Sequence, residues 1–195
     1  MYKTTCLTFL LAITIVVITN YGVSFRLVIP GDAVETARNI LANETLFRLN
    51  IVGDLLYLFN LIIILAALHV VLKPVSEGIS LIAGAARFVY ALVWAMVGLK
   101  IFTAIRFLSD AVYLQAFSTS QLQAMARLQL VEAYDLYYIG LPFWGLAGVL
   151  ISYLFLKSGY IPKLLAGFGL LASAWCVFCG VAFLIGPGFA NSVHP

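Results

Sequence analysis

Charged side chains are scarce in this sequence. Its 195 residues include eleven Lys or Arg and eight Asp or Glu, which makes 10% of the chain charged, against about 25% in soluble domains. Hydrophobic residues make up 64% of it, and the mean hydropathy is +1.08. A soluble domain of this size could not bury so much apolar surface, so that class is excluded. The chain also lacks a block of basic residues, which argues against a nucleic-acid partner.

Cysteine and histidine are rare too, and this restricts the redox and metal chemistry available. The three cysteines fall in apolar runs and define no disulfide framework. The two histidines, His69 and His194, have neither the spacing of a metal pair nor the placement of a bis-histidine haem site. Nucleophile-elbow, phosphate-loop and zinc-protease signatures are missing. We therefore expect no metal and no other cofactor, and we favour a protein that is not an enzyme.

Long uncharged runs predict helices that cross a membrane. A spanning helix needs about 20 mostly apolar residues, and five segments meet this requirement. We expect spanning helices at about 4–23, 45–72, 79–109, 132–157 and 161–185. The first is too long for a signal peptide, and no cleavage site follows it, so we expect it to be retained. The sequence thus predicts an all-α integral membrane bundle that forms a single domain over residues 1–195.

The two long links between these helices fall on one face of the membrane and carry helix-start signals. In "IPGDAVETARNILAN" (29–43), Asp32 is followed three residues later by Glu35, which resembles a capping box. In "FSTSQLQAMARLQL" (117–130), Ser118 and Gln121 repeat the pattern. We expect two short amphipathic helices that lie in the membrane interface on this face. The Lys and Arg distribution is nearly even and slightly favours a cytoplasmic N-terminus.

Three stretches of the sequence resemble one known family. They are "VIPGDAVETARNILANETLFRLNIVGDLL", "ALHVVLKPV" and "FWGLAGVLISYLFLKSGYIPKLLAGF". They resemble a bacterial membrane-protein family described only as a domain of unknown function, with its Pro-Gly-Asp, Leu-Lys-Pro-Val and Ser-Gly-x-x-Pro-Lys turns. The resemblance implies a protein of the bacterial cytoplasmic, or inner, membrane and implies no activity.

The chain departs from the pattern of this family at two places. His69 replaces a frequent Tyr. Members also usually continue past the equivalent of "ANSVHP" (190–195) into one more hydrophobic helix. We therefore expect this chain to lack the last helix of the family.

Ionisable residues inside spanning helices are candidates for a functional site, because an unpaired charge is costly in a membrane. Asp54 and Lys100 lie on a predicted hairpin at similar depth, so we expect them to face each other. The further candidates around them are Arg48, Tyr57, Arg106, Tyr134, Asp135 and Tyr138. This set predicts either a polar pocket for a small polar or amphipathic ligand, or for protons, or an ion-pair network that only fixes helix order.

Two other features lie apart from this set. Arg87 is nearer the opposite face, where its long side chain can extend towards the interface. "CVFC" (176–179) places Cys176 and Cys179 in the last helix as a weak candidate for redox exchange. We favour a packing role for this segment, because Ala172, Cys176 and Gly180 form a stripe of small residues.

The sequence leaves the biochemical activity open and favours one function class. We expect a non-catalytic accessory subunit or a small-ligand-binding membrane protein, in contact with membrane lipids and with a larger complex or further copies of itself. One alternative is a membrane enzyme that acts on a lipid, a quinone or a thiol in a pocket near the outer face. A less favoured alternative is a transporter, which would need an oligomer because five helices are few.

Overall fold

Four long helices dominate the fold. The computed structural model describes residues 10–29 and 31–186, and these residues contain helices and no strands. The long helices are α4 (Glu44–Leu72), α5 (Glu77–Phe107), α6 (Thr119–Ser158) and α7 (Lys163–Ile185). All four are long and apolar enough to cross a membrane. The chain is therefore a multi-pass membrane protein, as its composition predicts.

A shorter helical segment precedes them. Helix 10–19 is apolar and passes into a π-helical stretch, η1 (Val17–Ser24), and a last turn, α2 (Phe25–Leu27). The start that we expected for this helix, at residue 4, lies outside the described residues. The described part of the chain thus shows four spanning helices and one shorter apolar helix.

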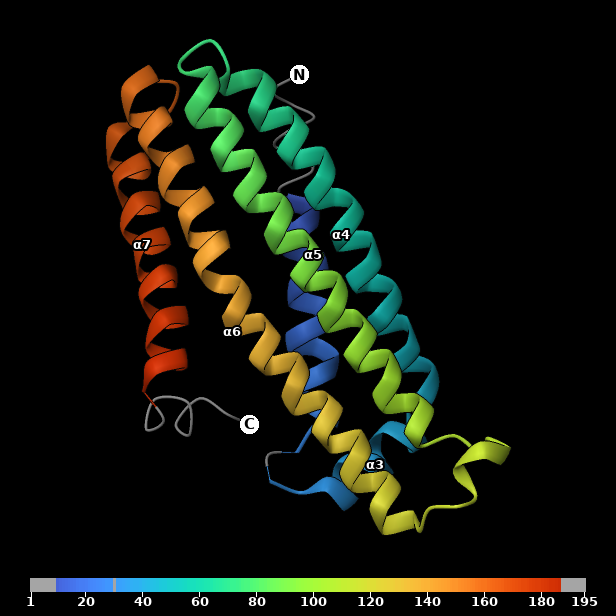
Figure 1. Cartoon of the computed structure of the whole chain (residues 1–195). Coiled ribbons are helices and arrows are strands. Elements are labelled where there is room, and N and C mark those ends of the chain that lie inside the picture. Colours follow the sequence, from blue (N-terminus) through green and yellow to red (C-terminus); the bar gives the residue numbers. More distant parts are fainter. Residues whose placement is uncertain (1–9, 30, 187–195) are drawn as a thin grey trace.

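The long helices stand side by side in chain order, from α4 to α7 (Figure 1). Neighbours in the sequence pack against each other, and η1 packs against α4. The short helix α3 (Ala33–Ala42) packs mainly against α6. It lies across the end of the bundle where α4 begins (Figure 1). One end of the bundle is therefore covered by α3, and the other end carries the two short links.

Local sequence accounts for where these helices begin and end. The side chain of Asp32 caps α3 by accepting a hydrogen bond from the backbone N–H of Glu35 at 2.9 Å. Gly31, with φ of 74°, makes the preceding turn. Pro74 follows Lys73, the C-cap of α4, and Gly159 ends α6 in the left-handed conformation at φ 68°. These signals act within a few residues, which is why the sequence alone reveals them.

The second interfacial helix does not form a separate element. Ser118 and Gln121 make the expected capping box, but the helix that they start is α6 itself, which runs for 40 residues. No Gly or Pro interrupts it before Gly140, so nothing ends the helix near residue 130. At 1.5 Å per residue it is roughly 60 Å long, about twice the hydrocarbon thickness. The helix is therefore longer than the hydrocarbon core is thick.

Helices α6 and α7 approach each other closely through small residues. A Cβ atom built on Gly145 would lie 2.6 Å from the backbone oxygen of Ser173, and one built on Gly180 would lie 2.8 Å from Cγ of Pro142. The packing role expected for Gly180 is confirmed. Ala172 is exposed, so the small-residue face of α7 is rotated from the expected stripe and runs through Gly169 and Ser173 instead.

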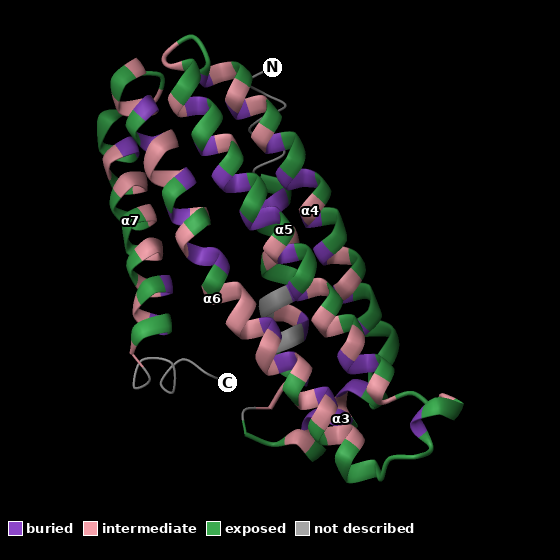
Figure 2. Ribbon diagram, viewed as in Figure 1, coloured by how far each residue is buried: buried purple, intermediate pink, exposed green. Residues whose placement is uncertain are grey.

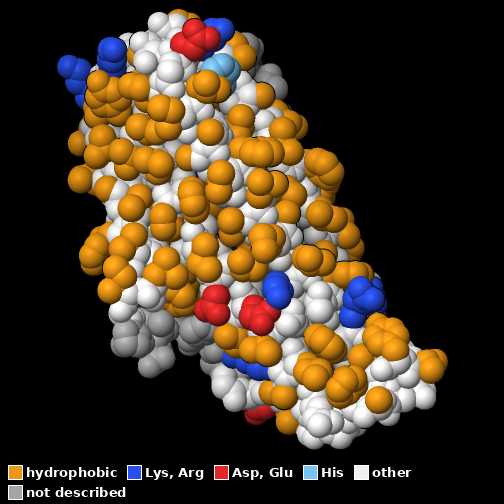
Figure 3. Space-filling view, viewed as in Figure 1, with side chains coloured by type: hydrophobic (Ala, Val, Ile, Leu, Met, Phe, Trp, Pro, Cys, Tyr) orange, Lys and Arg blue, Asp and Glu red, His pale blue; other side chains and the backbone are white. Residues whose placement is uncertain are grey.

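The outer surface is apolar. Buried residues face the interior of the bundle, and most outward positions are exposed (Figure 2). Large exposed hydrophobic side chains include Leu81 and Leu99 on α5 and Leu171 and Trp175 on α7. Figure 3 shows this apolar band between charged groups near both ends of the molecule. Such a surface is the one that lipid tails cover.

Candidate functional site

Asp54 is the most deeply buried acidic residue among those that the structure describes, with 4% of its surface exposed. It lies on α4 opposite the N-terminal segment. Its carboxyl group forms a hydrogen bond with the side chain of Thr19, whose hydroxyl oxygen lies 2.9 Å from the backbone oxygen of Ile15. Gly53 permits this approach, since a Cβ atom there would overlap the Thr19 methyl group. The other carboxyl oxygen, Oδ1, has no hydrogen-bond partner in the described part of the chain.

A groove of about 390 Å³ lies between α4 and α5 beside this carboxyl group. Asp54 and Trp94 are its buried polar residues. The indole Nε1 of Trp94, like Oδ1 of Asp54, has no hydrogen-bond partner within the described ranges. The other lining residues are Ile51, Leu55, Leu58, Ala95, Gly98, Leu99 and Phe102. The groove therefore has an apolar lining, and the unpartnered acceptor of Asp54 and donor of Trp94 are buried within two of its lining side chains.

The groove opens towards the lipid. Leu55 and Leu99 line it and are 50% and 62% exposed on the outer surface. Gly98 widens it, because a Cβ atom built there would meet nothing within 4 Å. A molecule that is dissolved in the bilayer can thus reach Asp54 and Trp94 from the side, without passing through water.

Three aromatic side chains contact the indole ring of Trp94. The rings of Tyr57 and Trp94 make an edge contact with centroids 5.3 Å apart. Tyr90 lies 5.9 Å from Trp94 and 4.8 Å from Trp144 of α6. Tyr137 of α6 makes another edge contact with Trp94 at 6.1 Å. Because Tyr57, Tyr90 and Trp94 are all buried, the indole has a fixed orientation before any ligand arrives.

Lys100 does not face Asp54, so the expected pairing of these two residues is wrong. Its ammonium group pairs with the carboxylate of Glu132 on α6, with a distance of 2.5 Å between Nζ and Oε2. The hairpin of α4 and α5 gives both residues a similar depth, but depth does not fix the direction of a side chain around the helix axis. Asp54 faces the N-terminal segment and the groove, whereas Lys100 faces α6.

The remaining site candidates do not line the groove. Arg48 makes an exposed ion pair with Glu44, with Nε and Oε1 2.7 Å apart. Tyr138 stacks on Phe183 of α7 at 4.2 Å between centroids. Tyr134 and Asp135 are half-buried on α6. Tyr57 is buried on α4 against Trp94, and Arg106 is exposed near the end of α5. These candidates therefore lie on three different helices and do not form one cluster with Asp54.

Trp94 is the groove residue that sequence reasoning missed, since a tryptophan in an apolar helix suggests a core or interface residue. A signal for it was present. Trp94 lies almost as far beyond the start of α5 as Asp54 lies before the end of α4. Counted from their link, Trp94 is closer to the level of Asp54 than Lys100 is.

The cysteines and the other metal-binding residue types form no metal centre in the described part of the chain. Cys176 and Cys179 are half-buried thiols without a disulfide. The third cysteine, Cys6, lies outside the described residues. Within residues 10–29 and 31–186, no three His, Cys, Asp or Glu side chains gather as metal ligands would.

The fold defines a helical multi-pass membrane protein. The chain belongs to the family described as Domain of unknown function (DUF4386), which it matches over residues 4–194. This match confirms the resemblance that the turn motifs indicate. No curated protein and no solved structure matches the chain.

Proposed function

We propose that this protein is a non-catalytic membrane protein that binds a small hydroxyl-bearing amphiphile in the groove between α4 and α5. The observation that carries the proposal is the pair of unused polar atoms, Oδ1 of Asp54 and Nε1 of Trp94, in one apolar groove. A buried polar atom without a partner costs about 1–3 kcal/mol. The proposed hydroxyl group donates to the carboxyl oxygen of Asp54 and accepts from the indole N–H of Trp94.

The size and lining of the groove support the same ligand class. Pockets for small molecules span about 300–1,000 Å³ and are mostly apolar with few polar groups, and this groove has about 390 Å³. Its apolar residues suit the alkyl part of an amphiphile. The π-helical stretch η1, which contributes Thr19 next to Asp54, adds support, because π-helical turns are frequent at functional sites.

We infer the following membrane arrangement. The segment from residue 4 to 23 is a fifth spanning helix, since its described part is apolar and packs against α4. Helix α3 lies in the interface, because its apolar side packs inwards and Arg38 and Glu35 form an ion pair on its outer side. The resemblance supports a bacterial inner membrane, and the charge distribution supports a cytoplasmic N-terminus. Membrane lipids are then constant partners, and the exposed face of α7 suits a further subunit or a second copy.

Native mass spectrometry of the protein in lipid nanodiscs tests the proposal, with 1-dodecanol as the probe. We expect wild type to retain dodecanol and to reject its methyl ether, which cannot donate to Asp54. Gly98→Leu fills the groove and should lose the alcohol. Gly167→Leu is the matched control, because a Cβ atom at Gly167 also meets nothing within 4 Å but lies on α7. Equal retention of alcohol and ether, or retention by Gly98→Leu, would contradict the proposal.

Asp54→Leu separates binding from structure. Replacing a buried ionisable group with an apolar one of similar size is often neutral or stabilising. We therefore expect the variant to fold with unchanged or higher thermal stability and to lose dodecanol. If instead Asp54→Leu folds and retains dodecanol as wild type does, Asp54 serves the packing of η1 and not a ligand.

A further inference from the structure

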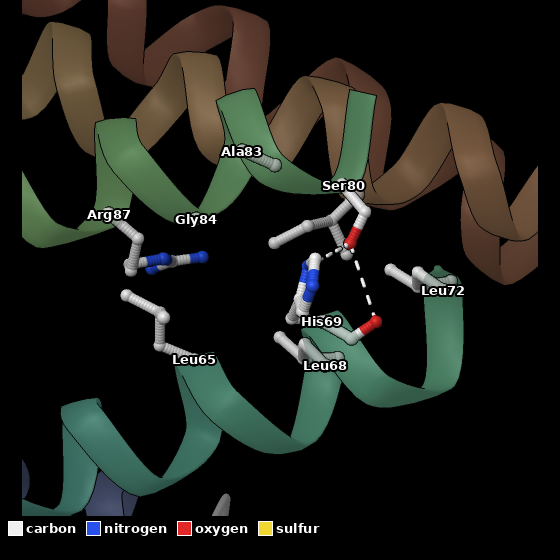
Figure 4. Close-up of a pocket in the computed structure, with 9 residues that line it drawn as sticks. Leu65, Leu68, His69, Leu72, Ser80, Ala83, Gly84 and Arg87 are labelled. Carbon is white, nitrogen blue, oxygen red and sulfur yellow. Dashed lines mark hydrogen bonds between the residues drawn. The ribbon is translucent and has the colours of Figure 1, made fainter. Parts of the chain in front are cut away.

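A second site lies between the other ends of α4 and α5, independent of the groove. Arg87 of α5 is 8% exposed, although its length would allow it to reach the interface as we expected. Its guanidinium group lies over the ring of Trp144, 3.5 Å from the centroid. Figure 4 shows the side chain pointing along the helices into a small cavity, with His69 on the opposite side.

This cation has no counter-ion in the described part of the chain. The ion pairs found there join other residues, and none includes Arg87. Its Nε atom also lacks a hydrogen-bond partner within the same ranges. The cation–π contact with Trp144 offsets part of the desolvation. A buried charge nonetheless needs a partner of opposite sign or several hydrogen bonds, and the protein side chains supply neither.

The polar groups at the cavity are suited to donate hydrogen bonds. Nδ1 of His69 lies 2.9 Å from Oγ of Ser80. The hydroxyl of Ser80 can donate to Nδ1 or to the backbone oxygen of His69, which lies 3.5 Å away. When it donates to Nδ1, the other ring nitrogen carries the proton and is the nitrogen left for a ligand. Arg87 has donors only. Together, Arg87 and His69 in this tautomer present N–H groups, which match an anion.

The space limits the size of that anion. The cavity leaves about 10 Å³, which is room for about one water-sized particle. Its remaining walls are apolar, namely Leu65, Leu68, Leu72, Ala83 and Ile151, together with Gly84. Phosphate, sulfate or a carboxylate would not fit without displacing these side chains.

We propose that the cavity bounded by Arg87, His69 and Gly84 binds one monatomic anion, with chloride as its natural occupant. The anion neutralises the buried guanidinium group and accepts from His69, and it thereby holds α4 against α5. The site is distinct from the Asp54 groove and does not depend on the proposed ligand there.

The thermal unfolding midpoint of the full chain in nanodiscs tests this proposal in chloride, bromide and gluconate. A ligand that binds only the folded state raises the midpoint until the site saturates. We expect a saturable rise with chloride and bromide and none with gluconate, which is too large to enter. An equal midpoint in chloride and gluconate would overturn the proposal.

Two variants show whether the effect comes from this cavity. Arg87→Gln should lose the chloride response and, in gluconate, should be no less stable than wild type, because it removes the uncompensated charge. Gly84→Ala places a methyl group at the cavity with its nearest neighbour, Cδ2 of Leu65, at 3.8 Å, so it should weaken the response. Gly78→Ala is the control, since its Cβ atom would meet nothing within 4 Å and Gly78 is not among the cavity-lining residues. A full chloride response in Gly84→Ala and Arg87→Gln would locate the anion elsewhere.

Anomalous diffraction from crystals grown in bromide gives a test that does not depend on variants. We expect an anomalous peak within hydrogen-bond distance of Arg87 and next to His69. Density for an internal water without an anomalous signal would overturn the proposal, whatever the stability data show.

Discussion

The interface between α4 and α5 and the interface between α6 and α7 are built in opposite ways. Large polar and aromatic residues, including Asp54, Arg87 and Trp94, lie between α4 and α5. Glycines such as Gly145 and Gly180 let α6 and α7 touch backbone to backbone. Small residues close the gap between α6 and α7, whereas between α4 and α5 Gly98 lines the groove and Gly84 lines the cavity. The comparison shows why both candidate binding sites lie on one side of the bundle.

The largest effect is expected where the tight interface is forced apart. Gly145→Val places a side chain against Ser173 and Val177 of α7, where a Cβ atom would lie 2.6 Å from backbone and side-chain atoms. Overpacking of this kind costs about 3 kcal/mol, which unfolding in mixed detergent micelles can measure. Gly167→Val is the control on α7, because its Cβ atom has open space. Equal losses in both variants would show that the close approach of α6 and α7 contributes nothing.

A smaller effect is expected from the aromatic partner of Arg87. Trp144→Leu removes the ring that lies 3.5 Å from the guanidinium carbon, and a desolvated cation–π contact contributes about 2 kcal/mol. Trp175→Leu makes the same replacement at a position that is 62% exposed to lipid and should change the free energy of unfolding little. If the two variants lose the same stability, Arg87 does not depend on Trp144.

The smallest effect is expected from the ion pair between α5 and α6. A double-mutant cycle with Lys100→Met and Glu132→Gln should give a coupling free energy of about 0.5–1 kcal/mol, because both side chains are partly exposed. The cycle of Lys100→Met with Asp54→Asn should give a coupling near zero. A larger coupling in the second cycle would restore the pairing of Asp54 with Lys100 across the hairpin.

Much of the fold is predictable from the sequence, because local chemistry determines it. Apolar runs and the turns at Pro74 and Gly159 place the ends of α4, α5 and α7 within about two residues of the observed ones. The cap at Asp32 and the capping box at Ser118 follow from the same kind of signal. The length of α6 was not predicted, because a signal for the start of a helix does not indicate where that helix ends.

The candidate site was less predictable, because it depends on rotation about helix axes. Hydropathy gives little information on which side of a helix faces a neighbour when all sides are apolar. The sequence singles out Asp54 as a candidate but does not predict its neighbours, as the pairing of Lys100 with Glu132 shows. Arg87 was expected to reach outwards, because the sequence does not reveal that Trp144 of α6 lies within reach.

The uninterrupted length of α6 has a mechanical consequence. Helix α6 makes three contacts along its length. It packs against α3, its Glu132 pairs with Lys100, and its Trp144 lies against the guanidinium group of Arg87. Pro142 lies between the last two contacts and removes one backbone hydrogen bond from the helix. Helix α6 therefore has a first part that packs against α3 and a last part that packs against α7. A displacement of α3 would be transmitted along α6 to Glu132 and Lys100 without crossing Pro142. It would reach Trp144 and Arg87 only past Pro142, where one backbone hydrogen bond of the helix is missing.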